Sequence, residues 1–167
     1  MGSRDYNQAE PLGSKLAKRG YVVCSGGYDG VMEAVLKGAA SEGGKCAGVL
    51  TRYFNFMDLK PNPWVQACVV AEELVDRMKG LYEVGDGFIG LPGSTGTLAE
   101  IAATLELINK ARSVAKPLIC LGNYWKPILD VIGEQARPFE PDQKVRSLIH
   151  FAGGADDIVD RLAENLG

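Results

Sequence analysis

The sequence is poor in side chains that bind transition metals. Its 167 residues include one histidine, His150, and four cysteines that lie far apart, Cys24, Cys46, Cys68 and Cys120. Because no C-x-x-C pair is present, neither a zinc site nor a disulfide framework is expected. The cysteines stand mostly within apolar runs, which favours buried, reduced thiols in a cytoplasmic protein.

Excess positive charge and long apolar runs are also missing. The net charge is −3, so there is no basic surface of the kind that binds nucleic acid. No apolar stretch approaches the ~20 residues of a membrane span, and no secretory signal or internal repeat is present. With 46% hydrophobic and 23% charged residues, the composition predicts one globular domain over residues 1–167.

Strand and helix patterns alternate along the chain. We expect helices at residues 5–19, 31–41, 72–84, 98–110, 125–135 and 156–166, and strands at 21–24, 46–50, 65–70, 88–91, 117–121 and 148–151. This order predicts an α/β fold, a single-domain, doubly wound, Rossmann-like and mostly parallel sheet with helices on both faces. Ligands of such sheets bind beyond the carboxyl ends of the strands.

The most informative stretch is residues 85–100. A short apolar run ends at Pro92, and the loop that follows, Gly93, Ser94, Thr95, Gly96 and Thr97, precedes a helix. Such a turn directs backbone N–H groups and the positive end of the helix dipole at one point, which favours an anion such as phosphate. The spacing matches neither the P-loop nor the dinucleotide motif. An alternative is a tight turn in which Thr97 and Glu100 form a capping box.

Two further segments are candidates for a ligand site. Gly26, Gly27 and Gly30 form a second turn between a strand and a helix, and the long loop 51–63 is rich in Phe, Tyr, Asn and Pro. Arg77 stands at the edge of an apolar helix stripe, from which a long cation could reach along the surface toward a cleft. Its simpler interpretation is an i,i+4 pair with Glu73.

These residues together resemble the LOG (LONELY GUY) family. Residues 91–100, L-P-G-S-T-G-T-L-A-E, are similar to its P-G-G-x-G-T-x-x-E signature. Arg77 stands where that family has an arginine, residues 86–89 (D-G-F-I) resemble its D-A-F-I strand, and residues 26–34 resemble its second glycine turn, including Met32. The resemblance extends from about Asp5 to about Leu121.

The sequence departs from that family at three points. Ser94 replaces the second glycine of the signature, and Met78 follows the arginine where a lysine is usual, with Lys79 one place later. The family's first strand is also missing or truncated, since only Met1, Gly2 and Ser3 precede the first helix pattern. Either residues upstream have been lost, or the strands near Val22 and Phe88 pair directly.

The resemblance implies hydrolysis of the N-glycosidic bond of a nucleoside 5′-monophosphate, such as AMP or a cytokinin riboside 5′-monophosphate, to free base and ribose 5-phosphate. Glu100 would act beside C1′, where the transition state is oxocarbenium-like, and Arg77 would orient the substrate and polarise the leaving group. No metal or redox cofactor is needed. The implied substrate-binding residues are Gly26, Gly27, Met32, Gly93, Ser94, Thr95, Gly96 and Thr97.

The label "lysine decarboxylase", often attached to this family, does not fit, because nothing marks a Schiff-base lysine for pyridoxal phosphate. The alternative is a non-catalytic molybdenum-cofactor carrier, which is similar in fold and size. The family also implies a homodimer or higher homo-oligomer. A second apolar stripe on the helix 98–110, formed by Ala99, Ala103 and Leu107, is consistent with that assembly.

Overall fold

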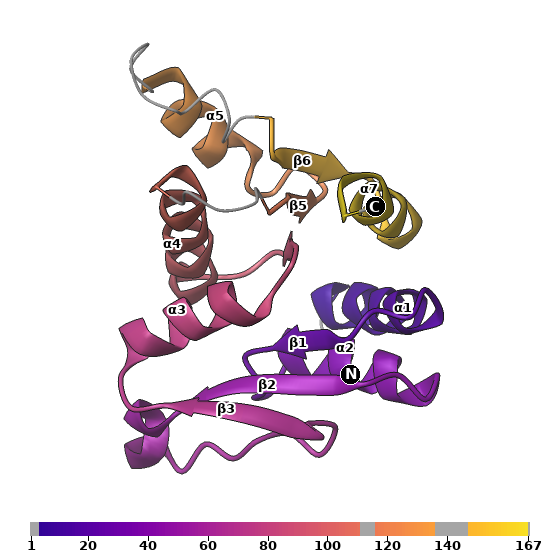
Figure 1. Cartoon of the computed structure of the whole chain (residues 1–167), viewed down its shortest axis with the longest axis vertical. Helices are drawn as coiled ribbons and strands as arrows, with labels where there is room; N and C mark the ends of the chain where they lie inside the picture. The colour runs from indigo at the N-terminus through magenta and orange to yellow at the C-terminus, as the bar shows by residue number, and fades with distance from the viewer. Residues whose placement is uncertain (1–3, 111–115, 136–146, 167) are drawn as a thin grey trace. The chain divides into compact units, whose positions relative to one another are not determined.

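The computed structural model describes residues 4–110, 116–135 and 147–166. It consists of two compact units, Met1–Gly85 and Asp86–Gly167, which are described in turn (Figure 1). The elements of the first are α1 (Arg4–Lys18), β1 (Val23–Ser25), α2 (Val31–Ser41), β2 (Cys46–Thr51), the 3₁₀ helix η1 (Arg52–Met57), β3 (Ala67–Ala71) and α3 (Leu74–Val84). Those of the second are β4 (Phe88–Gly90), α4 (Thr95–Lys110), β5 (Leu118–Leu121), α5 (Lys126–Gln135), β6 (Ile149–Ala152) and α7 (Ala155–Leu166).

The first unit contains a parallel three-stranded sheet in the order β1-β2-β3. Its central strand, β2, is buried because different neighbours cover its two faces. Cys46 donates its thiol to the Leu36 carbonyl of α2, whereas Val49 faces Gly80 of α3. Alternation along the strand therefore places α2 and α3 on opposite faces of this sheet.

Helices α1 and α2 approach each other closely through glycine. A Cβ on Gly13 would overlap the carbonyl of Val35, and one on Gly38 would overlap the carbonyl of Glu10. The crossing is flanked by fully buried Leu12 and Leu36. The two helices thus pack backbone to backbone, and no larger side chain fits at the contact.

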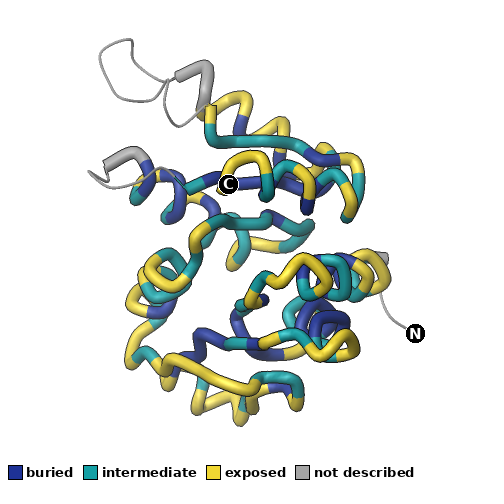
Figure 2. The backbone as a smooth tube through the Cα atoms, turned by 45° about the vertical axis from the view of Figure 1, so that its right-hand side comes forward, coloured by how far each residue is buried: buried dark blue, intermediate teal, exposed yellow. Residues whose placement is uncertain are grey.

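Strand β3 is more exposed than its apolar sequence suggests. The predicted strand 65–70 is largely apolar, yet Ala67, Cys68, Val69 and Val70 of β3 are all exposed (Figure 2). The reason lies in the strand order, because β3 is the outer strand of its sheet. Apolar periodicity identifies a strand, but it does not say whether that strand is central or at an edge.

The second unit contains a parallel three-stranded sheet in the order β4-β5-β6. Alternate residues of its central strand point to opposite faces. Leu118 and Cys120 join Ile101 and Leu105 of α4 in one core, together with Trp125 and Leu129. On the other side α7 buries Ile158, Val159 and Leu162 and packs along β5 and β6. Helices therefore cover both faces, as the sequence predicts.

The expected fold class is confirmed, with corrections of detail. Within the described residues β1 pairs with β2 in the first unit and β4 pairs with β5 in the second. Of the cysteines, Cys46 and Cys120 are buried and Cys24 is half-buried, but Cys68 is exposed. Helical spacing places Val75 of α3 and Ala102 of α4 in the apolar stripes of their helices, yet both side chains are exposed, so these two predictions are wrong. None of the described helices has the length and apolar character needed to cross a membrane.

The close α1–α2 contact gives a test of the first unit. Gly38→Ala should lower its stability by roughly 1–3 kcal/mol, because the new methyl group meets a backbone carbonyl that cannot move away alone. Gly153→Ala is the matched control, since a Cβ there meets no heavy atom within 4 Å. Urea unfolding measures both, and equal stabilities would contradict the predicted contact.

Candidate functional site

The turn after β4 presents the beginning of α4 to solvent. Ser94, Thr95 and Gly96 are exposed, and a Cβ on Gly96 would meet no heavy atom within 4 Å. The first N–H groups of a helix have no intrahelical partner, and the helix dipole places partial positive charge there. This end of α4 can therefore accept an anion, and the Ser94 hydroxyl lies at the same point.

The capping box proposed from sequence is wrong. Helix α4 begins at Thr95, and the N–H of Leu98 already donates to the carbonyl of Ser94 at 3.0 Å. Thr97 therefore lies inside the first turn and cannot be the capping residue with Glu100 at the third position. Its side chain instead packs against Gly93, where a Cβ would overlap it.

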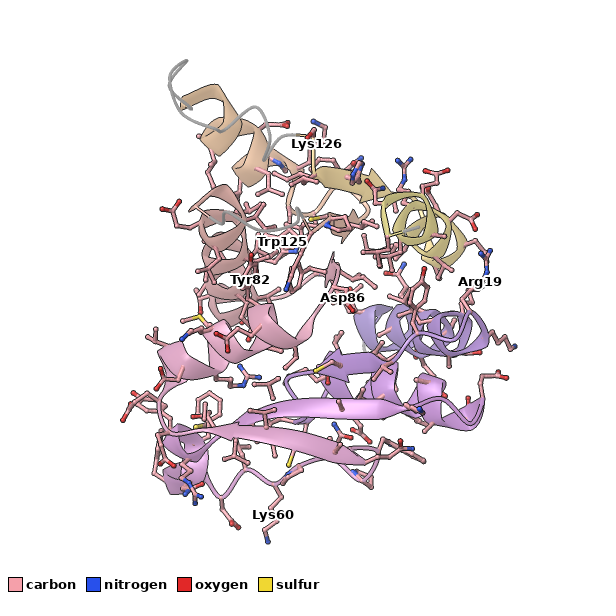
Figure 3. The ribbon with its side chains drawn as sticks, viewed as in Figure 1. Arg19, Lys60, Tyr82, Asp86, Trp125 and Lys126 are labelled. Atoms are coloured by element: carbon pink, nitrogen blue, oxygen red, sulfur yellow. The ribbon has the colours of Figure 1, made fainter. Side chains whose placement is uncertain are left out.

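Two aromatic residues after β5 hold this turn, and neither was predicted from the sequence as a site residue. The Tyr124 hydroxyl donates to the Gly93 carbonyl at 2.8 Å, and the Trp125 indole N–H donates to the Leu91 carbonyl at 2.9 Å. Figure 3 shows Trp125 beside α4, where it is part of the core. Both follow a strand at its carboxyl end, which is the signal that could have identified them.

Glu100 lies on α4 beyond this turn and is half-buried. It stands five positions after Thr95, about one and a half helical turns along. The Glu100 carboxylate is therefore carried by the same helix whose first turn could accept an anion. The structure thus keeps the predicted anion seat and the predicted acid or base on one helix.

The second glycine turn depends on two glycines in the left-handed region and on one serine hydroxyl. Gly27 and Gly30 have φ values of 75° and 72°, which side chains other than glycine rarely adopt. The Ser25 hydroxyl accepts from the N–H of Gly27 and donates to the carbonyl of Met32. The Ser25 hydroxyl therefore ties the turn both to itself and to the first turn of α2.

Arg77 is placed differently from the sequence expectation. Its side chain does not run along the surface but is buried, with 5% exposed. Nε donates to the Val49 carbonyl at 2.8 Å, and Nη2 donates to the Gly26 carbonyl at 3.3 Å and lies 3.9 Å from the sulfur of Met32. Gly26 must be glycine because a Cβ there would overlap this guanidinium.

The charge of Arg77 also acts on a neighbouring thiol. Burial raises the pKa of Cys24 above its ordinary value, and the nearby Arg77 guanidinium offsets part of that rise. In the second unit burial raises the pKa of Cys120 to about 11. Neither thiol is activated as a nucleophile, because both pKa values move away from neutrality.

The predicted site residues thus fall into two groups. The first unit brings together Gly26, Gly27, Met32 and Arg77, and the second carries residues 93–97 and Glu100. Within the described ranges, no three His, Cys, Asp or Glu side chains gather as a metal ion would require. The described second-unit group offers backbone N–H groups, hydroxyls and the Glu100 carboxylate, and the first-unit group offers the Arg77 guanidinium.

Comparison with known proteins agrees with these motifs. The sequence profile of the SLOG cluster4 family matches residues 1–149. The chain belongs to the SLOG cluster4 family. An uncharacterized protein of Archaeoglobus fulgidus is 30% identical over 117 residues, which cover 70% of this chain and 75% of that protein. The resemblance to LOG-type proteins is therefore confirmed as distant similarity within this group.

Other relatives have named activities. A pyrimidine/purine nucleotide 5′-monophosphate nucleosidase of Escherichia coli is 27% identical over 82% of this SLOG cluster4 chain but only 34% of its own length. A cytokinin riboside 5′-monophosphate phosphoribohydrolase of Rhodococcoides fascians is 27% identical over 81% of the chain and 69% of its own. The chain therefore spans about a third of the first enzyme and two thirds of the second.

Solved structures show the same fold. The molybdenum cofactor binding protein of Rippkaea orientalis superposes with a TM-score of 0.78 at 20% identity, covering 100% of this chain and 91% of that one. The molybdenum cofactor carrier protein of Chlamydomonas reinhardtii superposes with a TM-score of 0.72 at 20% identity, covering 99% of this chain and 94% of that one. At these identities the likeness establishes the Rossmann-like architecture of this family member.

The buried guanidinium gives a sharp test of the first unit. Arg77→Met keeps much of the apolar stem but leaves two carbonyls without their donor, which should cost roughly 2–4 kcal/mol of unfolding free energy. Lys79→Met is the matched control on the same helix, because the Lys79–Glu83 pair is exposed and should contribute under about 1 kcal/mol. Similar urea midpoints for the two variants would contradict the structural role of Arg77.

Proposed function

We propose that this protein hydrolyses the N-glycosidic bond of nucleoside 5′-monophosphates, releasing the free base and ribose 5-phosphate. The observation that carries the proposal is the exposed start of α4, which joins a phosphate seat to a carboxylate on one helix. The two relatives with named activities, which both act on nucleoside 5′-monophosphates, support it.

The 5′-phosphate binds at residues 93–97. The backbone N–H groups of the first helical turn donate to its oxygens, and the hydroxyls of Ser94 and Thr95 add two more donors. Ser94 stands where the LOG signature has glycine, and its exposed position leaves its hydroxyl accessible to the ligand. The seat is held in shape by Tyr124 and Trp125 through the carbonyls of Gly93 and Leu91.

Glu100 acts at the glycosidic carbon. When the base leaves, positive charge develops at C1′ and the ring oxygen, and a carboxylate stabilises it or accepts a proton from the attacking water. The water oxygen then forms the new bond to C1′, and the base leaves with the electron pair of the broken C–N bond and takes up a proton.

Arg77 contributes by positioning. Because its guanidinium is buried against the carbonyls of Gly26 and Val49, we assign it to holding the turn Gly26–Gly27 and Met32 in the shape that orients the substrate. The polarisation of the leaving group that the resemblance implies for Arg77 stays a prediction. Arginine suits the task because it stays charged and its planar fork donates in several directions.

The role of Glu100 is tested by Glu100→Gln. Gln keeps the size and the hydrogen-bonding geometry but removes the negative charge. We expect turnover of AMP to fall by roughly 10²–10⁴-fold while AMP binding and melting temperature stay close to those of the wild type. Turnover is measured by assaying free adenine, and AMP binding is measured by calorimetry.

Glu106→Gln is the matched control, since Glu106 lies on the same helix and is exposed. It should leave turnover unchanged. If Glu100→Gln turns over as fast as the wild type, Glu100 has no part in the mechanism.

The second candidate function is a non-catalytic carrier of the molybdenum cofactor. Burial of Arg77 favours it, because the predicted catalytic cation is only 5% exposed. The phosphate of a pterin cofactor could use the same helix start. Incubation with AMP separates the two functions: release of adenine supports the hydrolase, whereas pterin binding without base release supports the carrier.

A further inference from the structure

Strand β3 leaves one backbone edge of the first unit without a partner strand. On one side it pairs with β2 over all five of its residues, Ala67–Ala71, in a register without a bulge. On the other side it is the outer strand of its sheet (Figure 1), and no hydrogen bond among the described residues reaches it there. Such an edge presents a row of N–H and C=O groups that another extended strand can pair.

The sequence of β3 lacks the features that normally protect an edge strand. Its five residues, A-C-V-V-A, include no charge, proline or glycine. Natural edge strands commonly carry a lysine, a proline or a bulge, because these prevent pairing with another chain. Residues 67–70 are all exposed, Val69 by 50% and Val70 by 47%. Since alternate residues point to opposite faces of a sheet, both faces of this strand offer apolar surface.

A second copy of β3 is complementary to the first. In an antiparallel pair with its twofold axis at Val69, residue 70 of one copy faces residue 68 of the other, and residue 71 faces residue 67. Alanine then faces alanine, valine faces cysteine, and Val69 faces itself. All five residues of each strand are therefore opposite small or apolar residues of the other.

The charges beside the strand also suit this arrangement. In it Glu72 of one copy faces Gln66 of the other, so the two Glu72 carboxylates lie at opposite ends of the pair, roughly 20 Å apart. Each carboxylate is also paired with Arg52 of its own copy, at 2.9 Å from Nε. A parallel pair in register would instead place Glu72 opposite Glu72, and like charges directly opposite are destabilising.

We propose that β3 is a self-association surface, at which two copies of this chain join the three-stranded sheets of their first units into one continuous sheet. A twofold pair requires a self-complementary surface, and β3 with Gln66 and Glu72 meets that requirement. Association pairs the open backbone edge and removes the exposed valines from water. The inference uses only residues of the first unit and does not depend on the proposed hydrolysis.

The test places one charge at the centre of the pair. In light scattering at micromolar concentration, the wild type should have at least twice the mass of one chain. Val69→Lys should weaken association by about 5- to 30-fold, because residue 69 faces itself and the two lysines repel. Val69→Glu should weaken it for the same reason. An equimolar mixture of the two variants should restore association, since lysine then faces glutamate.

Val22→Lys is the matched control, because Val22 is an exposed valine beside β1, the strand at the other edge of the same sheet. It should associate as the wild type does, and melting temperatures confirm that all variants fold. A wild type with the mass of one chain overturns the inference. Association that Val69→Lys leaves unchanged also overturns it, because another surface then joins the copies. Failure of the mixture to associate contradicts the twofold register at Val69.

Discussion

The first unit depends on one buried guanidinium. Arg77 leaves α3 and donates to carbonyls on two neighbouring segments, at 2.8 Å to Val49 and 3.3 Å to Gly26. A charge removed from water must find such partners, so these segments are fixed relative to the helix. Tyr28 packs beside the same guanidinium and carries the constraint outward through Thr51 to η1. The glycine turn Gly26–Gly27 and the 3₁₀ helix η1 both depend on this interaction.

The second unit uses the same principle with different residues. The carbonyls of Leu91 and Gly93 in the turn after β4 are held by the indole of Trp125 and the hydroxyl of Tyr124. In both units a side chain from another element binds the carbonyl oxygens of a glycine turn. In the second unit this leaves the first N–H groups of α4 directed at solvent, which is the arrangement that anion binding requires.

Much of this could be predicted from local pattern. Helix α2 has the expected bounds, and most other elements lie within about two residues of their expected positions, because apolar periodicity reports directly on the helix and strand repeat. Helix α4 begins three residues earlier than expected, since its first turn is Thr95, Gly96 and Thr97, which show no apolar spacing. Helix η1 was missed because a single 3₁₀ segment rich in aromatic residues has no distinctive repeat.

The sequence by itself determined the order of strands and helices, the two glycine turns and the motif that places the chain in its family. Only the tertiary structure decided the roles of particular side chains. It buried Arg77 against Val49 and Gly26, which are 28 and 51 positions away, and it brought Tyr124 to Gly93 across 31 positions. It also exposed β3. Local patterns record the periodicity of one segment, whereas burial and hydrogen bonding depend on which distant segment packs against it.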